Sequence, residues 1–154
     1  MIILGIDPGT AATGFGIVKK SNELSSIAFG CIETSRNSST AQRLDKLHNE
    51  LNKLIKKYKP NIMAIEEIFF FKNLKTVIKV SEARGVCLLA ASQSRIPVKE
   101  CTPLQVKQAV TTYGRAEKKQ MQEMVKILLN LKEIPKPDDA ADALAVAIYC
   151  AHSL

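Results

Sequence analysis

The sequence predicts an α/β protein in which a mixed five-stranded sheet is flanked by helices, in one domain of residues 1–154. Three observations lead to this fold class. Short apolar runs bounded by Gly, Pro or polar turn residues are typical of strands. The first three runs are joined by short turns, which connect antiparallel strands. The later runs are separated by long helical patterns, and a helical crossover joins parallel strands.

The first strand candidate, residues 2–6, runs into Asp7 and a Pro-Gly turn. Residues 14–18 and 24–32 continue it as a β-meander. Asp7 thus closes a strand that should lie deep in the sheet, where an ionised carboxylate needs a partner. Two readings are open: Asp7 binds a cation or moves a proton, or it only accepts hydrogen bonds from the N–H groups of its own turn.

A helix is predicted over residues 44–58, because apolar residues recur there at helical spacing until Pro60 stops it. The next strand candidate, residues 62–67, carries Glu66 near its end. Since a helix connects it to the meander, this strand should lie parallel to the first. Ligands in α/β sheets gather at the carboxyl ends of parallel strands, so Asp7 and Glu66 are expected to share a site.

The rest of the chain is mainly helical. A helix predicted over residues 74–92 is so apolar that the core or a second subunit must cover most of it. A loop over residues 69–73 precedes this helix, and a short strand over 97–101 follows it. Three more helices are predicted, over residues 103–110, over 116–131 and from 138 onward.

Composition and charge restrict the class of protein. A net charge of +7, with a pI of about 9.3, favours an anionic partner such as nucleic acid. The four cysteines lie far apart without zinc-ligand spacing, so we expect buried thiols in a cytoplasmic protein. Neither a signal peptide nor an apolar run long enough to cross a membrane is recognised.

The last predicted helix carries three acids. Asp139 and Asp142, three residues apart, share a helix face, and so do Asp138 and Asp142, four apart. One of the first two suits the helix N-terminus as a cap, whereas Asp142 lies a turn further in, among Ala and Leu. Together with the two strand-end acids, this set would repel itself unless a divalent cation such as Mg²⁺ bound it. Two such ions can hydrolyse a phosphodiester. His48 and His152 are expected at the surface.

Several segments match the motifs of one known family. They are Gly5–Thr10 with Thr13 and Gly14, Ala64–Glu66 with Phe69, Lys72 and Asn73, and Asp139–Ala145, with shorter matches at residues 83–86, 105–108 and 116–118. Together they resemble the RuvC family, the bacterial Holliday junction resolvases, over nearly the whole chain. The resemblance implies an RNase H-like fold.

The resemblance implies that Asp7, Glu66, Asp139 and Asp142 are both the catalytic residues and the ligands of two Mg²⁺ ions per subunit, which Mn²⁺ replaces. Spacing alone still leaves Asp138 as an alternative to Asp139. The implied activity is a homodimeric endodeoxyribonuclease that resolves four-way junction DNA by paired symmetric nicks, in homologous recombination and DNA repair. The RuvA–RuvB branch-migration complex is the implied partner, and the helix from residue 74 is the implied dimer contact.

The resemblance also implies that Phe69, Lys107 and Lys118 contact DNA, with Phe69 stacking on bases at the junction centre. The residues alone leave an alternative in which both lysines are ordinary solvated side chains and Phe69 packs in the core. For Phe70 and Phe71 the same choice between the core and DNA is open. Two other functions are weighed: a related nuclease acting on RNA, and a non-catalytic nucleic-acid-binding module. An actin-like ATPase shares the Gly-Ile-Asp start but needs two such domains.

Overall fold

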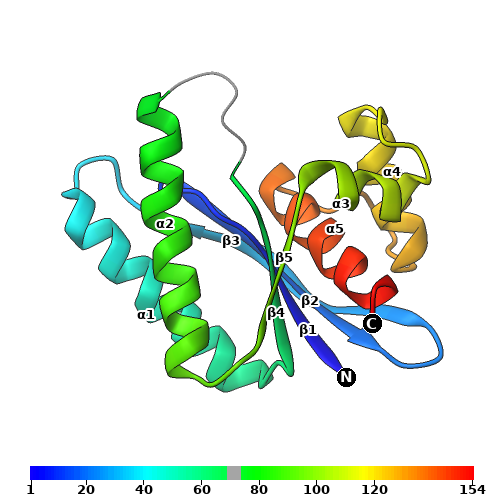
Figure 1. The fold of residues 1–154 in the computed structure, drawn as a ribbon, viewed down its shortest axis with the longest axis horizontal. Coiled ribbons are helices and arrows are strands. Elements are labelled where there is room, and N and C mark those ends of the chain that lie inside the picture. Colours follow the sequence, from blue (N-terminus) through cyan, green and yellow to red (C-terminus); the bar gives the residue numbers. More distant parts are fainter. Residues whose placement is uncertain (69–73) are drawn as a thin grey trace.

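The structure is a computed structural model that describes residues 1–68 and 74–154. Within these residues one sheet is formed by β1 (Ile2–Asp7), β2 (Ala12–Lys20), β3 (Leu24–Glu33), β4 (Ile62–Glu66) and β5 (Val98–Cys101). Its strand order is β3-β2-β1-β4-β5 (Figure 1). β1 pairs antiparallel with β2 and parallel with β4, which confirms the predicted mixed sheet. β2 is longer than predicted because it pairs along most of its length with both β1 and β3.

Helices cover both faces of the sheet. In the described part of the chain they are α1 (Thr40–Tyr58), α2 (Leu74–Gln93), α3 (Pro103–Thr111), α4 (Lys118–Leu128) and α5 (Asp138–His152). α1 and α2 lie on one face, and α5 lies against the other, with α3 and α4 packed on it (Figure 1). Side chains of β1 point alternately to the two faces of the sheet and so contribute to both cores. Leu4 and Ile6 pack with α1 and α2, whereas Ile3 packs with α5.

Local sequence sets the ends of the helices. Ser39 and Thr102 cap α1 and α3, each in a capping box with a glutamine three residues later. α4 is shorter than the predicted range 116–131. It starts only after its N-cap, Glu117, and it has ended before Asn130, which takes a positive φ of 50°. The apolar pattern therefore continues past the last residues that can hold helical geometry.

α2 buries only one of its faces. Its buried residues are Ala83, Cys87, Ala90 and Ala91. Its opposite face exposes large apolar side chains, those of Leu74, Ile78 and Leu89. The core therefore covers this apolar helix on one side, and the other side is exposed in the part of the chain that the structure describes.

The cysteines are free thiols, three of them buried and Cys31 half-buried. Burial raises the pKa of the Cys87 thiol to about 12, which keeps this side chain protonated. None of the helices in the described residues is both long enough and apolar enough to cross a membrane.

Candidate active site

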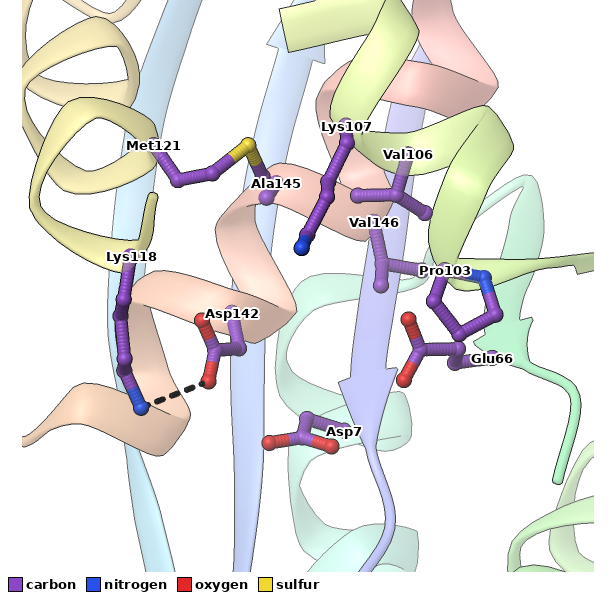
Figure 2. Close-up of a pocket in the computed structure, with 10 residues that line it drawn as sticks. All are labelled: Asp7, Glu66, Pro103, Val106, Lys107, Lys118, Met121, Asp142, Ala145 and Val146. Carbon is purple, nitrogen blue, oxygen red and sulfur yellow. Dashed lines mark ion pairs between the residues drawn. The ribbon is translucent and has the colours of Figure 1, made fainter. Parts of the chain in front are cut away.

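β1 and β4 bring two acids to one edge of the sheet. The strands run parallel with Ile6 beside Ile65, so Asp7 and Glu66 follow as neighbouring strand ends. Both carboxylates point toward a common space between the strands and the helices (Figure 2). The two acids that the sequence assigned to one edge therefore lie together.

α5 brings Asp142 to the same space because its backbone approaches the sheet very closely. A Cβ atom added at Gly14 of β2 would lie 2.0 Å from the carbonyl oxygen of Asp139. One added at Gly5 of β1 would lie 2.1 Å from another backbone carbonyl oxygen of α5. Only glycine leaves room for such an approach. Since Gly14 pairs with Asp7 across β1 and β2, α5 begins directly beside Asp7.

A cavity of about 260 Å³ lies between the carboxylates and helices α3 and α4. Lys107 of α3 and Lys118 of α4 extend into it (Figure 2). The Nζ of Lys118 lies 3.4 Å from Oδ2 of Asp142. The remaining lining residues are apolar: Pro103, Val106, Met121, Ala145 and Val146. Acids and lysines thus face each other across an otherwise apolar cavity.

Burial and mutual repulsion favour the protonated forms of these acids. Burial first, and then the charges of Asp142, Glu66 and Asp139, raise the pKa of Asp7 from 3.8 to about 7. Burial and the Asp142 charge raise the pKa of Glu66 from 4.5 to about 7, although Lys107 acts to lower it. Burial also raises the pKa of Asp142. The carboxylates therefore lack sufficient positive charge around them.

The two acids that begin α5 point in different directions. Asp138 is exposed and pairs with Lys118 at 3.1 Å, a contact that lowers the pKa of Asp138. Asp139 is half-buried, its Oδ2 lies 4.0 Å from the Sγ of Cys31, and its charge raises the pKa of Asp7. Of the two acids between which the spacing could not choose, Asp139 is therefore the one that acts on Asp7.

The chemistry of this acid set fits a hard divalent cation. All its potential ligand atoms are oxygens, which Mg²⁺ and Mn²⁺ prefer, and a cation would remove the repulsion that raises the pKa values. Within residues 1–68 and 74–154, no three His, Cys, Asp or Glu side chains are already gathered tightly enough to hold an ion. Holding an ion between these carboxylates would therefore take some rotation of their side chains.

The histidines lie outside the cavity. His48 Nε2 lies 2.8 Å from the side-chain oxygen of Gln93, and His152 Nδ1 lies 3.3 Å from the carbonyl oxygen of Ala109. The predicted DNA contact at Phe69 falls outside the described residues, so it stays a prediction.

One group of charged residues near the site could not be recognised from the sequence. Arg36, Arg43 and Lys79 line a second hollow that Asp139 also lines. No motif or regular spacing joins these three positions in the sequence. They come together because the β3–α1 connection, α1 and α2 meet beside the β1–β2 turn.

Comparison with known proteins then identifies the family. A family model described as "Crossover junction endodeoxyribonuclease RuvC" matches residues 3–151. This chain belongs to the RuvC family. Two RuvC proteins, each named crossover junction endodeoxyribonuclease RuvC, illustrate the similarity. The protein of Heliobacterium modesticaldum is 54% identical, over 100% of this chain and 96% of its own length. The protein of Caldanaerobacter subterraneus subsp. tengcongensis is 58% identical, over 99% of this chain and 93% of its own length.

Solved RuvC structures have the same fold. The structure of Thermus thermophilus RuvC matches with a TM-score of 0.90 and 33% identity, covering 99% of this chain and 95% of that one. The same protein in complex with a Holliday junction substrate matches with a TM-score of 0.93 and 33% identity. The match covers 99% of this chain and 94% of that one. These matches confirm the RNase H-like fold that the resemblance implied.

Proposed function

We propose that this RuvC family chain is a Holliday junction resolvase, a divalent-metal-dependent endonuclease that nicks two symmetric strands of a four-way DNA junction during recombination and repair. The observation that carries the proposal is the convergence of Asp7, Glu66 and Asp142 on one cavity that Lys107 and Lys118 also line. Supporting it, two relatives matched over 96% and 93% of their own length are named crossover junction endodeoxyribonuclease, and one solved relative is in complex with a Holliday junction substrate.

The proposed metal ligands are Asp7, Glu66, Asp139 and Asp142, which would hold two Mg²⁺ ions, with Mn²⁺ as a substitute. Bound ions supply a water of lowered pKa and stabilise the charge on the leaving oxygen. The chain's own part is to fix the carboxylates on two strand ends and one helix, where rigid elements hold their spacing. Asp139 is preferred to Asp138 because its charge reaches Asp7.

Lys107 and Lys118 are proposed to bind the phosphate backbone of the strand to be cut. Their ammonium groups line the cavity that the carboxylates face, so a phosphate placed there would meet both. Lys118 pairs with Asp138 and Asp142 in this structure. A cation held by Asp142 would weaken the pull of that carboxylate on Lys118, and the exposed Asp138 would then be its remaining acidic partner beside the phosphate. Such contacts add affinity without reading sequence.

A homodimer is proposed to form through the exposed face of α2. Leu74, Ile78, Gly85 and Leu89 lie on one helix face by their spacing, and the three apolar side chains are each more than half exposed. A Cβ added at Gly85 would meet nothing within 4 Å, so the described part of this chain does not require glycine there. Glycine inside a helix costs about 0.5–1 kcal/mol relative to alanine. A second copy of α2 packed against Gly85 explains both features, and it would supply the second site that paired nicking needs.

Two further parts of the proposal rest on the family resemblance. One is cooperation with the RuvA–RuvB branch-migration complex, and the other is a cytoplasmic location. Binding of purified RuvA–RuvB and this chain to the same junction, compared with each alone, tests the first. Fractionation of cells that express the tagged chain tests the second.

Cleavage of a synthetic four-way junction, a plain duplex and an RNA/DNA hybrid, with and without Mg²⁺, tests the activity. We expect paired nicks in the junction only, and only with the metal. Preference for the hybrid would make the chain an RNA-directed nuclease, and binding without any cleavage would make it a non-catalytic module. Asp7→Asn should bind junctions as a folded dimer without cutting them. Substantial cleavage by this variant in Mg²⁺ would remove Asp7 from the mechanism.

A further inference from the structure

A second hollow, of about 600 Å³, lies on the Asp139 side of the site and is lined by three basic side chains. Arg36 lies in the connection from β3 to α1, Arg43 near the start of α1, and Lys79 in α2. Residues 9–11 of the β1–β2 turn line it as well, together with Ala12, the first residue of β2. We call this the basic hollow.

The charges of the basic hollow suit an anion. Arg36 and Lys79 are exposed, and the ion pairs formed among the described residues do not include them. The acid that lines the hollow with them is Asp139, one of the proposed metal ligands. A bound cation would neutralise Asp139, so the hollow is most positive when the catalytic site is loaded.

Arg43 is held in place by a chain of hydrogen bonds. Its Nε donates to Oγ1 of Thr34 at 2.8 Å, and Thr34 Oγ1 donates to the carbonyl oxygen of Thr10 at 2.5 Å. Thr10 Oγ1 in turn donates to the carbonyl oxygen of Lys79 at 2.7 Å. These hydrogen bonds tie together α1, the connection that follows β3, the β1–β2 turn and α2. A guanidinium ordered in this way loses less conformational entropy when it binds a ligand.

The basic hollow is continuous with the catalytic cavity. A third hollow, of about 290 Å³, lies between them. It shares Asp7 and Glu66 with the catalytic cavity and Thr76 and Val80 with the basic hollow. One groove therefore leads from the lysines of α3 and α4, past the carboxylates, to the three cations of the basic hollow.

We propose that the basic hollow binds backbone phosphates of the DNA strand being cut, beyond the carboxylates as seen from Lys107 and Lys118. The inference rests on the proposed function, because it needs a scissile phosphate at the carboxylates. Arginine forks match phosphate oxygens, and threonine hydroxyls add donors. Among the residues that the structure describes, none that lines the hollow carries an aromatic side chain on which a base could stack. The hollow therefore sets the register of the strand without reading its sequence.

The test compares junction binding by the double variant Arg36→Gln/Lys79→Gln with that of the parent protein, in EDTA so that nothing is cut. Both side chains are exposed, so the fold should be unaffected. Each lost phosphate contact lowers the slope of log K against log salt by about 0.9, so the double variant should lose about 1.8. Affinity at 0.1 M salt should fall on the order of 10-fold. The matched control is Lys56→Gln, an exposed lysine near the far end of α1, which should change neither quantity.

A methylphosphonate scan locates the contact. Neutral linkages are placed one at a time on each side of the cut bond. In the parent protein, one or two positions on one side should weaken binding, and in Arg36→Gln/Lys79→Gln, which keeps Arg43, the same positions should have a clearly smaller effect. An unchanged salt slope in the double variant, an equal loss in Lys56→Gln, or a scan unaffected by the double substitution would each overturn the inference.

Parallel cleavage assays separate the two proposals. A parent protein that cuts no junction in Mg²⁺ refutes the proposed function. A parent protein that cuts junctions, while the double variant binds them with the parental affinity and salt slope, refutes only the role of the basic hollow.

Discussion

Replacing Asp7 by asparagine is expected to stabilise the metal-free fold while it abolishes cleavage. Burial and the neighbouring carboxylates raise the pKa of Asp7 from 3.8 to about 7. At about 1.4 kcal/mol for each pKa unit, the ionised side chain costs the folded protein at most about 4 kcal/mol. Because the acids share protons and can rotate apart, we expect Asp7→Asn to raise the free energy of unfolding by about 2 kcal/mol at pH 8. Most substitutions lower this free energy, so the sign alone is informative.

The size of this gain should depend on pH. An acid whose pKa is higher in the folded than in the unfolded state binds its proton more tightly when folded, so stability falls as pH rises between the two values. That window runs from 3.8 to about 7 for Asp7, and from 4.5 to about 7 for Glu66. The difference between Asp7→Asn and the parent protein should therefore be close to zero near the lower end of this window and largest above its upper end.

Urea denaturation followed by circular dichroism measures the effect, since the chain has no tryptophan for fluorescence. Samples contain EDTA at a fixed protein concentration, because a dimer's stability depends on concentration. Glu67→Gln is the matched control: Glu67 is exposed, and its replacement should change stability by less than about 0.5 kcal/mol. Added Mg²⁺ should stabilise the parent protein more than Asp7→Asn. If Asp7→Asn is the less stable protein at pH 8 in EDTA, the argument from burial and repulsion is wrong.

Three further substitutions probe the positions of the acids. Asp139→Asn should lower the cleavage rate at saturating Mg²⁺ by on the order of 10²-fold or more, whereas Asp138→Asn should leave it near the parental rate; the reverse order would exchange their roles. Gly14→Ala should lower the free energy of unfolding by about 1–3 kcal/mol in urea melts, because its Cβ would lie 2.0 Å from the Asp139 carbonyl oxygen. An unchanged midpoint would refute that close contact. Lys118→Met should tighten Mg²⁺ binding in calorimetry and weaken junction binding, because a competing cation is lost; weaker metal binding would contradict the competition.

The strand-end acids were predictable because each closes an apolar run. Asp7 and Glu66 follow short buried strands, and the helix between those strands makes them parallel, so their meeting follows from chain order. Asp142 could be recognised as well, because a carboxylate in an Ala- and Leu-rich helix needs a compensating charge. Neighbours in sequence and the geometry of one crossover are enough to single out these three acids.

The choice between Asp138 and Asp139 could not be made from the sequence. Both lie in the first turn of α5, and the rotation of that helix on the sheet decides which one faces Asp7. That rotation is set by contacts with Gly5 of β1 and Gly14 of β2, which are far from α5 in the sequence. The basic hollow was hidden for a related reason, since its three cations come from segments with no common pattern.

The close contact between α5 and the sheet has a consequence for how the protein tolerates change. Main chain touches main chain along this seam, so repacking among the large core side chains can be absorbed without shifting the acids. A single methyl group added at Gly5 or Gly14 cannot be accommodated by side-chain repacking and would push α5, with its acids, away from Asp7. Random mutagenesis should therefore find that substitutions among the large core side chains are tolerated better than substitutions at these two glycines. Engineering of substrate choice belongs on the outer helices, where the spacing of the acids is not at stake.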